Sequence, residues 1–376
     1  MRFVETVADK GIKHRIVEMA DGGMVGHALM LHEDEGGGGL ALAVALAQYL
    51  LCENRHDGDS CGQCSACSRV SRLIHPDLHF AFPVSASSRS SSDKKPTSEN
   101  YMEQWRELYA ANPYFTEQQL YDALGMESKS GNISVAEAKR IIERLTLTAL
   151  EGYYKIMVIW LPERMNSEAA NKLLKILEEP YEGTLFILVT QAPEKVISTI
   201  SSRCRHLRVP PMPRAELAAE LERRFSLAHE DALSVAASSS GSFGKACMRI
   251  SGNADTEEYR EILKSLIDAS LSKDLYGAVL CGERAAALPG REKQKAFCTY
   301  ACSFVRNMLM IRNGLSSIAD ADSDETEYIS KTAFSVRQDF FDKAIAAMDR
   351  AYMLIDRNVS AKTVFCDLAD RFYLYI

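Results

Sequence analysis

The sequence predicts an α/β domain built on a parallel sheet, followed by two groups of helices. In residues 1–210, short apolar runs alternate with helical patterns, which is typical of βαβ units. Beyond Pro213 the chain reads as successive helices with no convincing strand. At 376 residues it also exceeds what one hydrophobic core usually supports. We expect a core domain at 1–210, a small helical lid domain at 211–252 and a larger helical domain at 253–376.

Five apolar runs are predicted to form the strands of the sheet. Each contains β-branched or aromatic residues and is short enough for a buried parallel strand. Helical patterns separate them, which favours crossover connections. The predicted strands are 26–31, 78–82, 155–161, 184–190 and 205–209.

One helix can be placed closely, at residues 167–179. Asn166 is a capping residue at its start, and Pro180 ends it. Glu178 and Glu179 are unusual there, because carboxylates at a helix C-terminus oppose the helix dipole. Such a pair indicates either a contact surface or a solvated helix end.

Residues 84–132 interrupt this framework and look like an insertion. The Ser- and Lys-rich stretch 84–100 is predicted to be a mobile loop, and 101–124 reads as one or two helices. An amphipathic helix is expected at 134–149. A second polar stretch, 316–327, is predicted to separate helices of the last domain. The sequence gives the insertion no role.

The composition restricts the class of protein. A net charge of −7 and a pI of about 5.7 argue against a free-standing, nonspecific DNA binder, although not against DNA contact within an assembly. No signal peptide and no stretch of about 18 apolar residues is present, so a cytoplasmic protein is expected. The ten cysteines are therefore better read as thiols or metal ligands than as disulfides.

A glycine-rich loop lies where a phosphate-binding loop would be. Residues 32–41 join a predicted strand to a strongly apolar helix and contain Gly36, Gly37, Gly38 and Gly39. In the pattern G-x-x-x-x-G-K-[ST], backbone N–H groups cradle phosphates, the lysine contacts them and the hydroxyl binds magnesium. The core is therefore predicted to be similar to a P-loop NTPase.

The residues that such a loop needs are missing. Glu33 stands at the first glycine, Gly39 at the lysine and Leu40 at the Ser/Thr position. Glu33, Asp34 and Glu35 would also repel a polyphosphate. Taken alone, the four glycines are equally well explained as a flexible turn.

A second loss concerns the acidic pair that an ATPase carries after its third strand to hold magnesium and activate water. Those positions are Trp160 and Leu161, and neither can bind a metal or accept a proton. The two losses together predict that this chain neither binds nor hydrolyses ATP.

Four cysteines form a candidate metal site with the spacing C-x8-C-x2-C-x2-C. Four thiolates within 16 residues can surround one tetrahedral Zn²⁺ with no open position, which predicts a structural zinc. An iron–sulfur cluster would use the same ligands, and unligated thiols would be prone to oxidation. The expected ligands are Cys52, Cys61, Cys64 and Cys67.

The triplet Ser202-Arg203-Cys204 precedes the last predicted strand. Arg203 should therefore project at the edge of the sheet, beside a neighbouring subunit. An arginine supplied in trans stabilises charge in phosphoryl transfer. From the spacing alone, a solvated arginine in a loop is the simpler explanation.

Taken together, these motifs resemble the bacterial clamp-loader subunits, which are AAA+ proteins of the DNA polymerase III holoenzyme. The resemblance rests on the cysteines after the loop helix, HPDLHF (75–80), ANKLLKILEEP (170–180) and the SRC triplet, and it covers about residues 1–250 apart from the insertion. The degenerate loop indicates a non-hydrolysing member rather than the ATP-binding gamma/tau subunit.

The resemblance implies an AAA+ core, a lid and a helical collar that assembles into a ring with gamma/tau and delta subunits. It implies that Arg203 acts as a trans arginine finger on a neighbour's nucleotide, while the complex loads the sliding clamp onto primed DNA. It also implies a lid arginine in ATP-binding relatives, whose place is taken here by Gly244.

Two other functions remain open at this point. The first is an active clamp-loader ATPase of the gamma/tau type with an unusual loop, against which Gly39, Leu40, Trp160 and Leu161 argue. The second is a zinc-dependent DNA-binding regulator, which would need a basic surface around the cysteines. The cysteine segment contains Arg55 but several acidic residues.

Overall fold

The computed structural model describes the chain except for residues 86–95, 127–130, 252–253, 320 and 322. It contains two compact units. Of the described residues, the first comprises those within 1–126, 131–213 and 241–245, and the second comprises those within 214–240 and 246–376.

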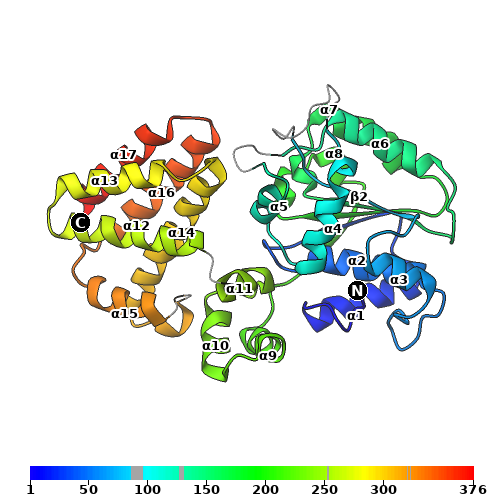
Figure 1. Cartoon of the computed structure of the whole chain (residues 1–376), viewed down its shortest axis with the longest axis horizontal. Coiled ribbons are helices and arrows are strands. Elements are labelled where there is room, and N and C mark those ends of the chain that lie inside the picture. The colour runs from blue at the N-terminus through cyan, green and yellow to red at the C-terminus, as the bar shows by residue number, and fades with distance from the viewer. Residues whose placement is uncertain (86–95, 127–130, 252–253, 320, 322) are drawn as a thin grey trace. The chain divides into compact units, whose positions relative to one another are not determined.

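The first unit is built on a five-stranded parallel sheet, as predicted (Figure 1). The strand order is β2-β3-β4-β1-β5, so that β2 and β5 form the two edges. All five predicted strands are present within two residues of their expected ends. They are β1 (Ala28–His32), β2 (Leu78–Ala81), β3 (Lys155–Trp160), β4 (Thr184–Thr190) and β5 (Arg205–Arg208).

Alternate residues of each strand face the two sides of the sheet. Leu29 and Leu31 of β1 pack in one hydrophobic core with α1 and α2, whereas Met30 packs in the other with α6 and α7. Helices therefore cover both faces, as Figure 1 shows. The helices of this unit are α1 (Lys10–Asp21), α2 (Gly39–Leu51), α3 (Ser65–Ser71), α4 (Met102–Ala111), α5 (Glu117–Ala123), α6 (Val135–Thr146), α7 (Ser167–Glu178) and α8 (Ser198–Ser201).

Helix α7 confirms the helix predicted at residues 167–179. The side chain of Asn166 caps its start by accepting a hydrogen bond from the Ala169 N–H at 2.8 Å, and the helix ends two residues before Pro180. Helix α6 begins after its capping Ser134 but ends at Thr146, three residues earlier than expected. Its C-cap, Leu147, has an extended backbone, and the segment then leads to β3.

The insertion contains both predicted helices, α4 and α5, and one element that was not predicted. Residues 86–95 lie outside the described part of the chain, but the prediction of a mobile loop is wrong for its end, where a 3₁₀ helix, η1, spans Ser98–Tyr101. Ser98 is buried, and its N–H and hydroxyl donate to the Glu137 carboxylate at 2.7 and 2.8 Å. A buried carboxylate on α6 therefore orders this part of the insertion.

After Pro213 the described elements are helical, as expected. Helices α12 to α17 share one hydrophobic core, and α9 packs against α10. The predicted polar break at 316–327 is too long, because a helix already begins at residue 323. The helices are α9 (Arg214–Phe225), α10 (His229–Ala237), α11 (Phe243–Ile250), α12 (Ala254–Leu271), α13 (Leu275–Ala286), α14 (Arg291–Arg312), α15 (Ser323–Thr332), α16 (Phe340–Asp356) and α17 (Ala361–Tyr375).

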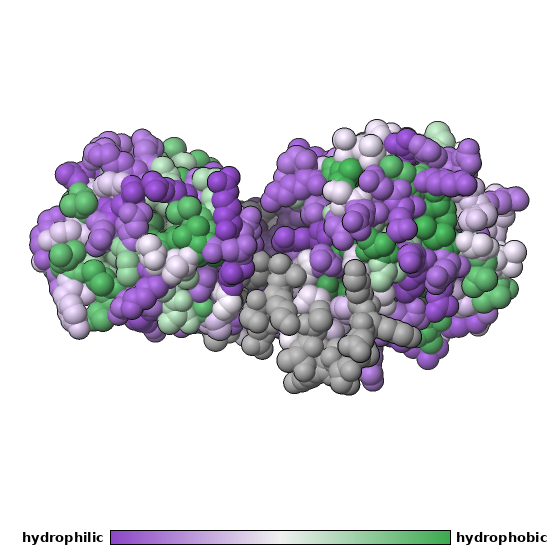
Figure 2. Space-filling model, turned by 90° about the horizontal axis from the view of Figure 1, so that it is seen from above, coloured by the Kyte–Doolittle hydropathy of each residue, from purple (hydrophilic) through white to green (hydrophobic). Residues whose placement is uncertain are grey.

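The visible surface of each unit is mixed in character. Figure 2 shows hydrophilic residues interspersed with hydrophobic ones rather than segregated from them. Among the described residues, none of the helices combines the length and the hydropathy needed to span a bilayer.

Candidate functional site

The glycine-rich loop joins β1 to α2, as a phosphate-binding loop would. Gly36 and Gly38 have φ values of +71° and +94°, a left-handed conformation that favours glycine. Gly38 caps α2, which begins at Gly39. The N–H groups at the start of α2, which have no acceptor within the helix, therefore face the loop, where an anion would be stabilised.

The side chain of Glu33 occupies the interior of this loop. It is buried, and its Oε2 accepts a hydrogen bond from the Gly39 N–H at 2.5 Å. A Cβ atom on Gly39 would lie 3.0 Å from this oxygen, and one on Gly37 would lie 3.3 Å from it. Neither position can therefore carry a side chain unless Glu33 moves, and this includes the lysine that the motif requires at position 39.

Burial also changes the acidity of Glu33. Loss of solvent raises its pKa to about 8, the Gly39 N–H opposes this shift, and the nearby Glu163 carboxyl adds to it. Glu163 accepts hydrogen bonds from the Thr190 hydroxyl and the Gln191 N–H, and burial raises its pKa as well. Two carboxyl groups thus lie close together where an ATPase would place negatively charged phosphates.

The positions of the missing acidic pair are buried in hydrophobic surroundings. Trp160 ends β3, and its ring packs edge-on against Phe115 at 5.2 Å and against Trp105 at 5.6 Å between ring centres. Leu161 is also buried, with a φ of +57°. Neither residue offers a ligand for magnesium.

Gly244, at the place of the lid arginine, lies directly against the glycine-rich loop. Its N–H donates to the Gly36 carbonyl at 3.0 Å, and the Ser242 hydroxyl donates to the Glu35 carbonyl at 2.8 Å. A Cβ atom on Gly244 would overlap the carbonyl oxygen of Tyr114. In this conformation position 244 has no room for an arginine.

The four predicted cysteines lie together and could hold a metal ion. Their sulfur atoms are all within 4.8 Å of one another, and among the described residues they form the one group with metal-ligand geometry. The sulfur atoms of Cys52 and Cys61 are 3.5 Å apart, and those of Cys61 and Cys67 are 3.9 Å apart. Ligands about 2.3 Å from a tetrahedral ion are about 3.8 Å apart, so the cluster has the required size.

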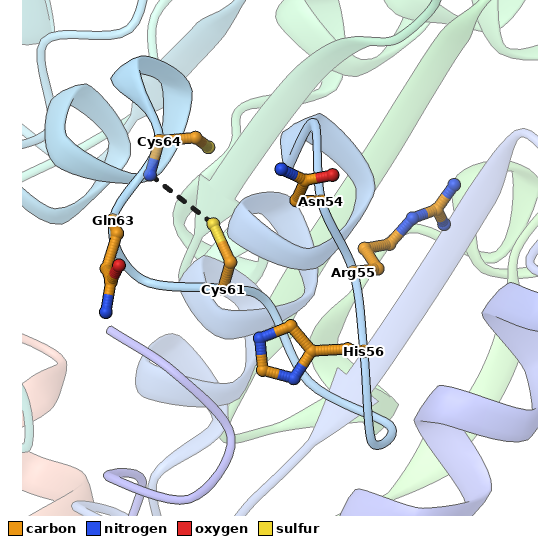
Figure 3. A pocket seen from close by; sticks show the side chains of 6 residues that line it. All are labelled: Asn54, Arg55, His56, Cys61, Gln63 and Cys64. Atoms are coloured by element: carbon orange, nitrogen blue, oxygen red, sulfur yellow. Dashed lines mark hydrogen bonds between the residues drawn. The ribbon is translucent and has the colours of Figure 1, made fainter.

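Backbone N–H groups support these sulfur atoms. The Cys64 N–H donates to the Cys61 sulfur at 3.4 Å, as Figure 3 shows, and the Cys67 N–H donates to the Cys64 sulfur at the same distance. The N–H groups of Gln63 and Cys64 lower the pKa of Cys61 to about 6. Hydrogen bonds of this kind favour the Cys61 thiolate, the form that binds metals, whereas burial raises the pKa of Cys52 and of Cys67.

The loop between the cysteines also holds the start of the chain. The Asp59 carboxylate accepts hydrogen bonds from the Phe3 and Val4 N–H groups at 3.0 and 2.9 Å. The N-terminal amine donates to Gln48, whose amide donates to Ser60. The segment between the cysteines therefore positions residues 1–7, and Val7 at the end of those residues lies against the glycine-rich loop.

Arg203 lies just before the edge strand β5, as predicted, but it is not simply solvated. Its guanidinium forms an ion pair with Glu178 at the end of α7 and donates to the Thr199 carbonyl at 2.6 Å. Its side chain remains about one-third exposed.

Comparison with known proteins assigns the family. The family described as "DNA polymerase III, delta subunit" matches residues 8–213, which is more than half of the chain. The chain belongs to this family. It is 26% identical over 309 residues to DNA polymerase III subunit delta' of Escherichia coli K12, covering 82% of this chain and 77% of that protein.

A second curated relative and a solved structure are also similar to this chain. The delta' subunit of Yersinia pestis is 31% identical over 180 residues, which is 47% of this chain and 40% of that protein. A solved gamma subunit-related protein of Thermotoga maritima aligns with 97% of this chain and 98% of its own, with 15% identity and a TM-score of 0.39. The family is that of the delta prime clamp-loader subunits.

The structure adds residues that the sequence did not single out. Glu178 was noticed only as an unfavourable charge at a helix end, and its pairing with Arg203 explains that charge. Tyr114 and Val7 also contact the glycine-rich loop. Nothing in the sequence indicates these two contacts, because Val7 and Tyr114 lie in segments distant from the loop and 107 residues from each other.

The acidity of Glu33 leads to a testable prediction. Because its pKa is raised from 4.5 to about 8 in the folded protein, its contribution to stability is fully present below pH 4.5 and is lost as the pH rises through 8. Glu33→Gln keeps the hydrogen bond from Gly39 without titrating. We expect the fall in Tm between pH 6 and pH 9 to shrink by about 3 °C or more, given ~1.4 kcal/mol per pKa unit.

Thermal unfolding followed by circular dichroism at both pH values measures this effect. Asp34→Asn changes an exposed neighbouring carboxylate and serves as the matched control. An unchanged pH dependence in Glu33→Gln would show that Glu33 is not buried as described.

Proposed function

We propose that this chain is the non-hydrolysing delta prime subunit of a DNA polymerase III clamp loader. It assembles in the cytoplasm with gamma/tau and delta subunits, binds no ATP itself, and offers Arg203 to the nucleotide of a neighbouring gamma/tau subunit. The complex uses that ATP to load the sliding clamp onto primed DNA. The observation that supports this proposal best is the position of Arg203 relative to the chain's own glycine-rich loop.

The two features lie at opposite ends of the parallel strands. The loop follows the C-terminal end of β1, whereas Arg203 precedes the N-terminal end of β5, which pairs with β1 in parallel. Arg203 therefore lies away from the loop of its own chain. An arginine in this place, next to an edge strand, is suited to a nucleotide bound by another subunit.

The ion pair with Glu178 fits the same role. A carboxylate beside Arg203 holds the guanidinium in one orientation while the subunit is free. A γ-phosphate carries more negative charge than a carboxylate and can replace it as the partner of the arginine. Glu178 would then position Arg203 without contacting the nucleotide.

Arg203→Ala should leave this chain folded, because the ion pair that it removes is partly exposed. In the reconstituted complex the substitution should slow hydrolysis at the nucleotide that Arg203 faces by about 10³-fold or more. Arg205→Ala, which removes an exposed arginine at the start of β5 itself, is the matched control, and the complex that contains it should hydrolyse ATP at the wild-type rate. Wild-type hydrolysis by the Arg203→Ala complex would refute the trans-arginine role.

We also propose that the four cysteines bind a structural zinc ion. The sulfur spacing fits a tetrahedral ion, all four positions are filled by thiols, and the N–H groups around the sulfurs stabilise thiolates. When bound, the ion would cross-link the segment from Cys52 to Cys67. The loop that carries Asp59, and with it the N-terminal segment, would then be held in place.

Freshly purified protein should contain about one zinc per chain by elemental analysis. Cys64→Ser should abolish this zinc and lower the Tm of the first unit by roughly 5 °C or more, since structural zinc contributes to folding directly. Cys366→Ser, outside the cluster, should change neither quantity. Iron in place of zinc, or no metal, would overturn the assignment.

A further inference from the structure

We propose that residues 97–126 form a built-in plug of the nucleotide site, in which Tyr114 and Phe115 occupy the space next to all three positions where nucleotide-binding residues are lost. This inference rests on the part of the proposed function that denies ATP to this chain, and it gives the insertion a role. It does not depend on Arg203.

Tyr114 covers the glycine-rich loop. Its side chain is buried, and its hydroxyl accepts a hydrogen bond from the Val7 N–H at 2.6 Å. A Cβ atom on Gly38 would lie 2.9 Å from the Val7 carbonyl oxygen and 3.3 Å from the Tyr114 ring. Val7 and Tyr114 thus close the loop from outside, while Glu33 fills it from within.

Phe115 covers the position of the acidic pair. Its ring lies 5.2 Å from that of Trp160, and both contact Trp105, at 5.1 and 5.6 Å. The Trp105 ring in turn stacks on Phe82 at 4.1 Å. An aspartate at position 160 would be buried in this aromatic cluster without a partner, which is strongly unfavourable.

Tyr114 also occupies the space beside the lid position. Its ring packs edge-on against Phe243 at 4.9 Å, and its carbonyl oxygen lies where a side chain on Gly244 would begin. Two consecutive residues of the insertion therefore contact the glycine-rich loop, the strand end and the lid segment. The losses at positions 160 and 244 are explained by the plug, because an acidic side chain at 160 would be buried beside it and a side chain at 244 would collide with it. A lysine at position 39 would instead meet Glu33, and the plug covers the neighbouring Gly38.

The plug is fixed at both of its ends. Near its start, Ser98 is bound to Glu137, which also pairs with Arg140 of α6. Near its end, Glu117 forms an ion pair with Arg164 at 2.7 Å, directly after the strand that carries Trp160. These contacts hold Tyr114 and Phe115 in place without help from another subunit.

Hydrogen exchange of the isolated chain tests this inference. In Tyr114→Ala the amides of residues 36–41 should exchange about tenfold faster or more, because a buried cover of the loop is removed. Tyr276→Ala, which removes an exposed tyrosine of the second unit, is the control and should leave these amides unchanged. Circular dichroism establishes that each variant is folded.

If Tyr114→Ala does not fold, a second variant, Tyr114→Phe, tests the plug. Tyr114→Phe retains the ring and loses only the acceptor for Val7, so exchange of the Val7 amide should rise while residues 36–41 change little. The plug would be contradicted if the amides of residues 36–41 exchanged at the wild-type rate in a folded Tyr114→Ala variant. It would also be contradicted if the Val7 amide exchanged at the wild-type rate in Tyr114→Phe. Because no ATP hydrolysis is measured, failure of the Arg203 role would leave this result unaffected.

Discussion

Gly36, Gly38 and Gly39 of the glycine-rich loop are packed against other residues of the chain, and this constraint determines much of the site around them. Glu33 lies inside the loop against Gly39. Val7 and Tyr114 lie over Gly38, and Ser242 and Gly244 are hydrogen-bonded to the loop backbone. The glycines are needed because these neighbours leave no room for side chains.

Filling the loop also changes the role of the helix end. The first N–H groups of a helix stabilise an anion. Here the Gly39 N–H, at the start of α2, donates a hydrogen bond to the Glu33 carboxyl group of the same chain. Burial makes that carboxyl group largely neutral at pH 7, which lowers the cost of placing it next to Glu163. A site suited to phosphate is thus converted into part of the folded core.

The two ends of the sheet have different proposed tasks. At the C-terminal ends of the strands the loop, Trp160 and the insertion are closed against one another. At the N-terminal ends, Arg203 is partly exposed and paired with Glu178. In the proposed role this second end serves a neighbour's nucleotide. The segment between the cysteines supports the first end by anchoring residues 1–7 through Asp59.

The sequence was sufficient for features that depend on local pattern. Strands β1 to β5 and helix α7 follow from apolar runs, capping by Asn166 and the stop at Pro180. The cysteine cluster follows from its spacing. The sequence could not predict that Tyr114 meets Val7 or that Glu178 meets Arg203, because these contacts depend on how distant segments pack. The end of the predicted loop at 84–100 was wrong for the same reason, since Glu137 on α6 orders Ser98.

The most direct test of the account is equilibrium binding of ATP with magnesium to the purified chain, measured by titration calorimetry or filter binding. A loop filled by Glu33 and covered by Tyr114 predicts no saturable binding at millimolar ATP. Stoichiometric, magnesium-dependent binding would contradict it, because ATP could reach the loop only if Glu33 and Tyr114 were not where the structure places them.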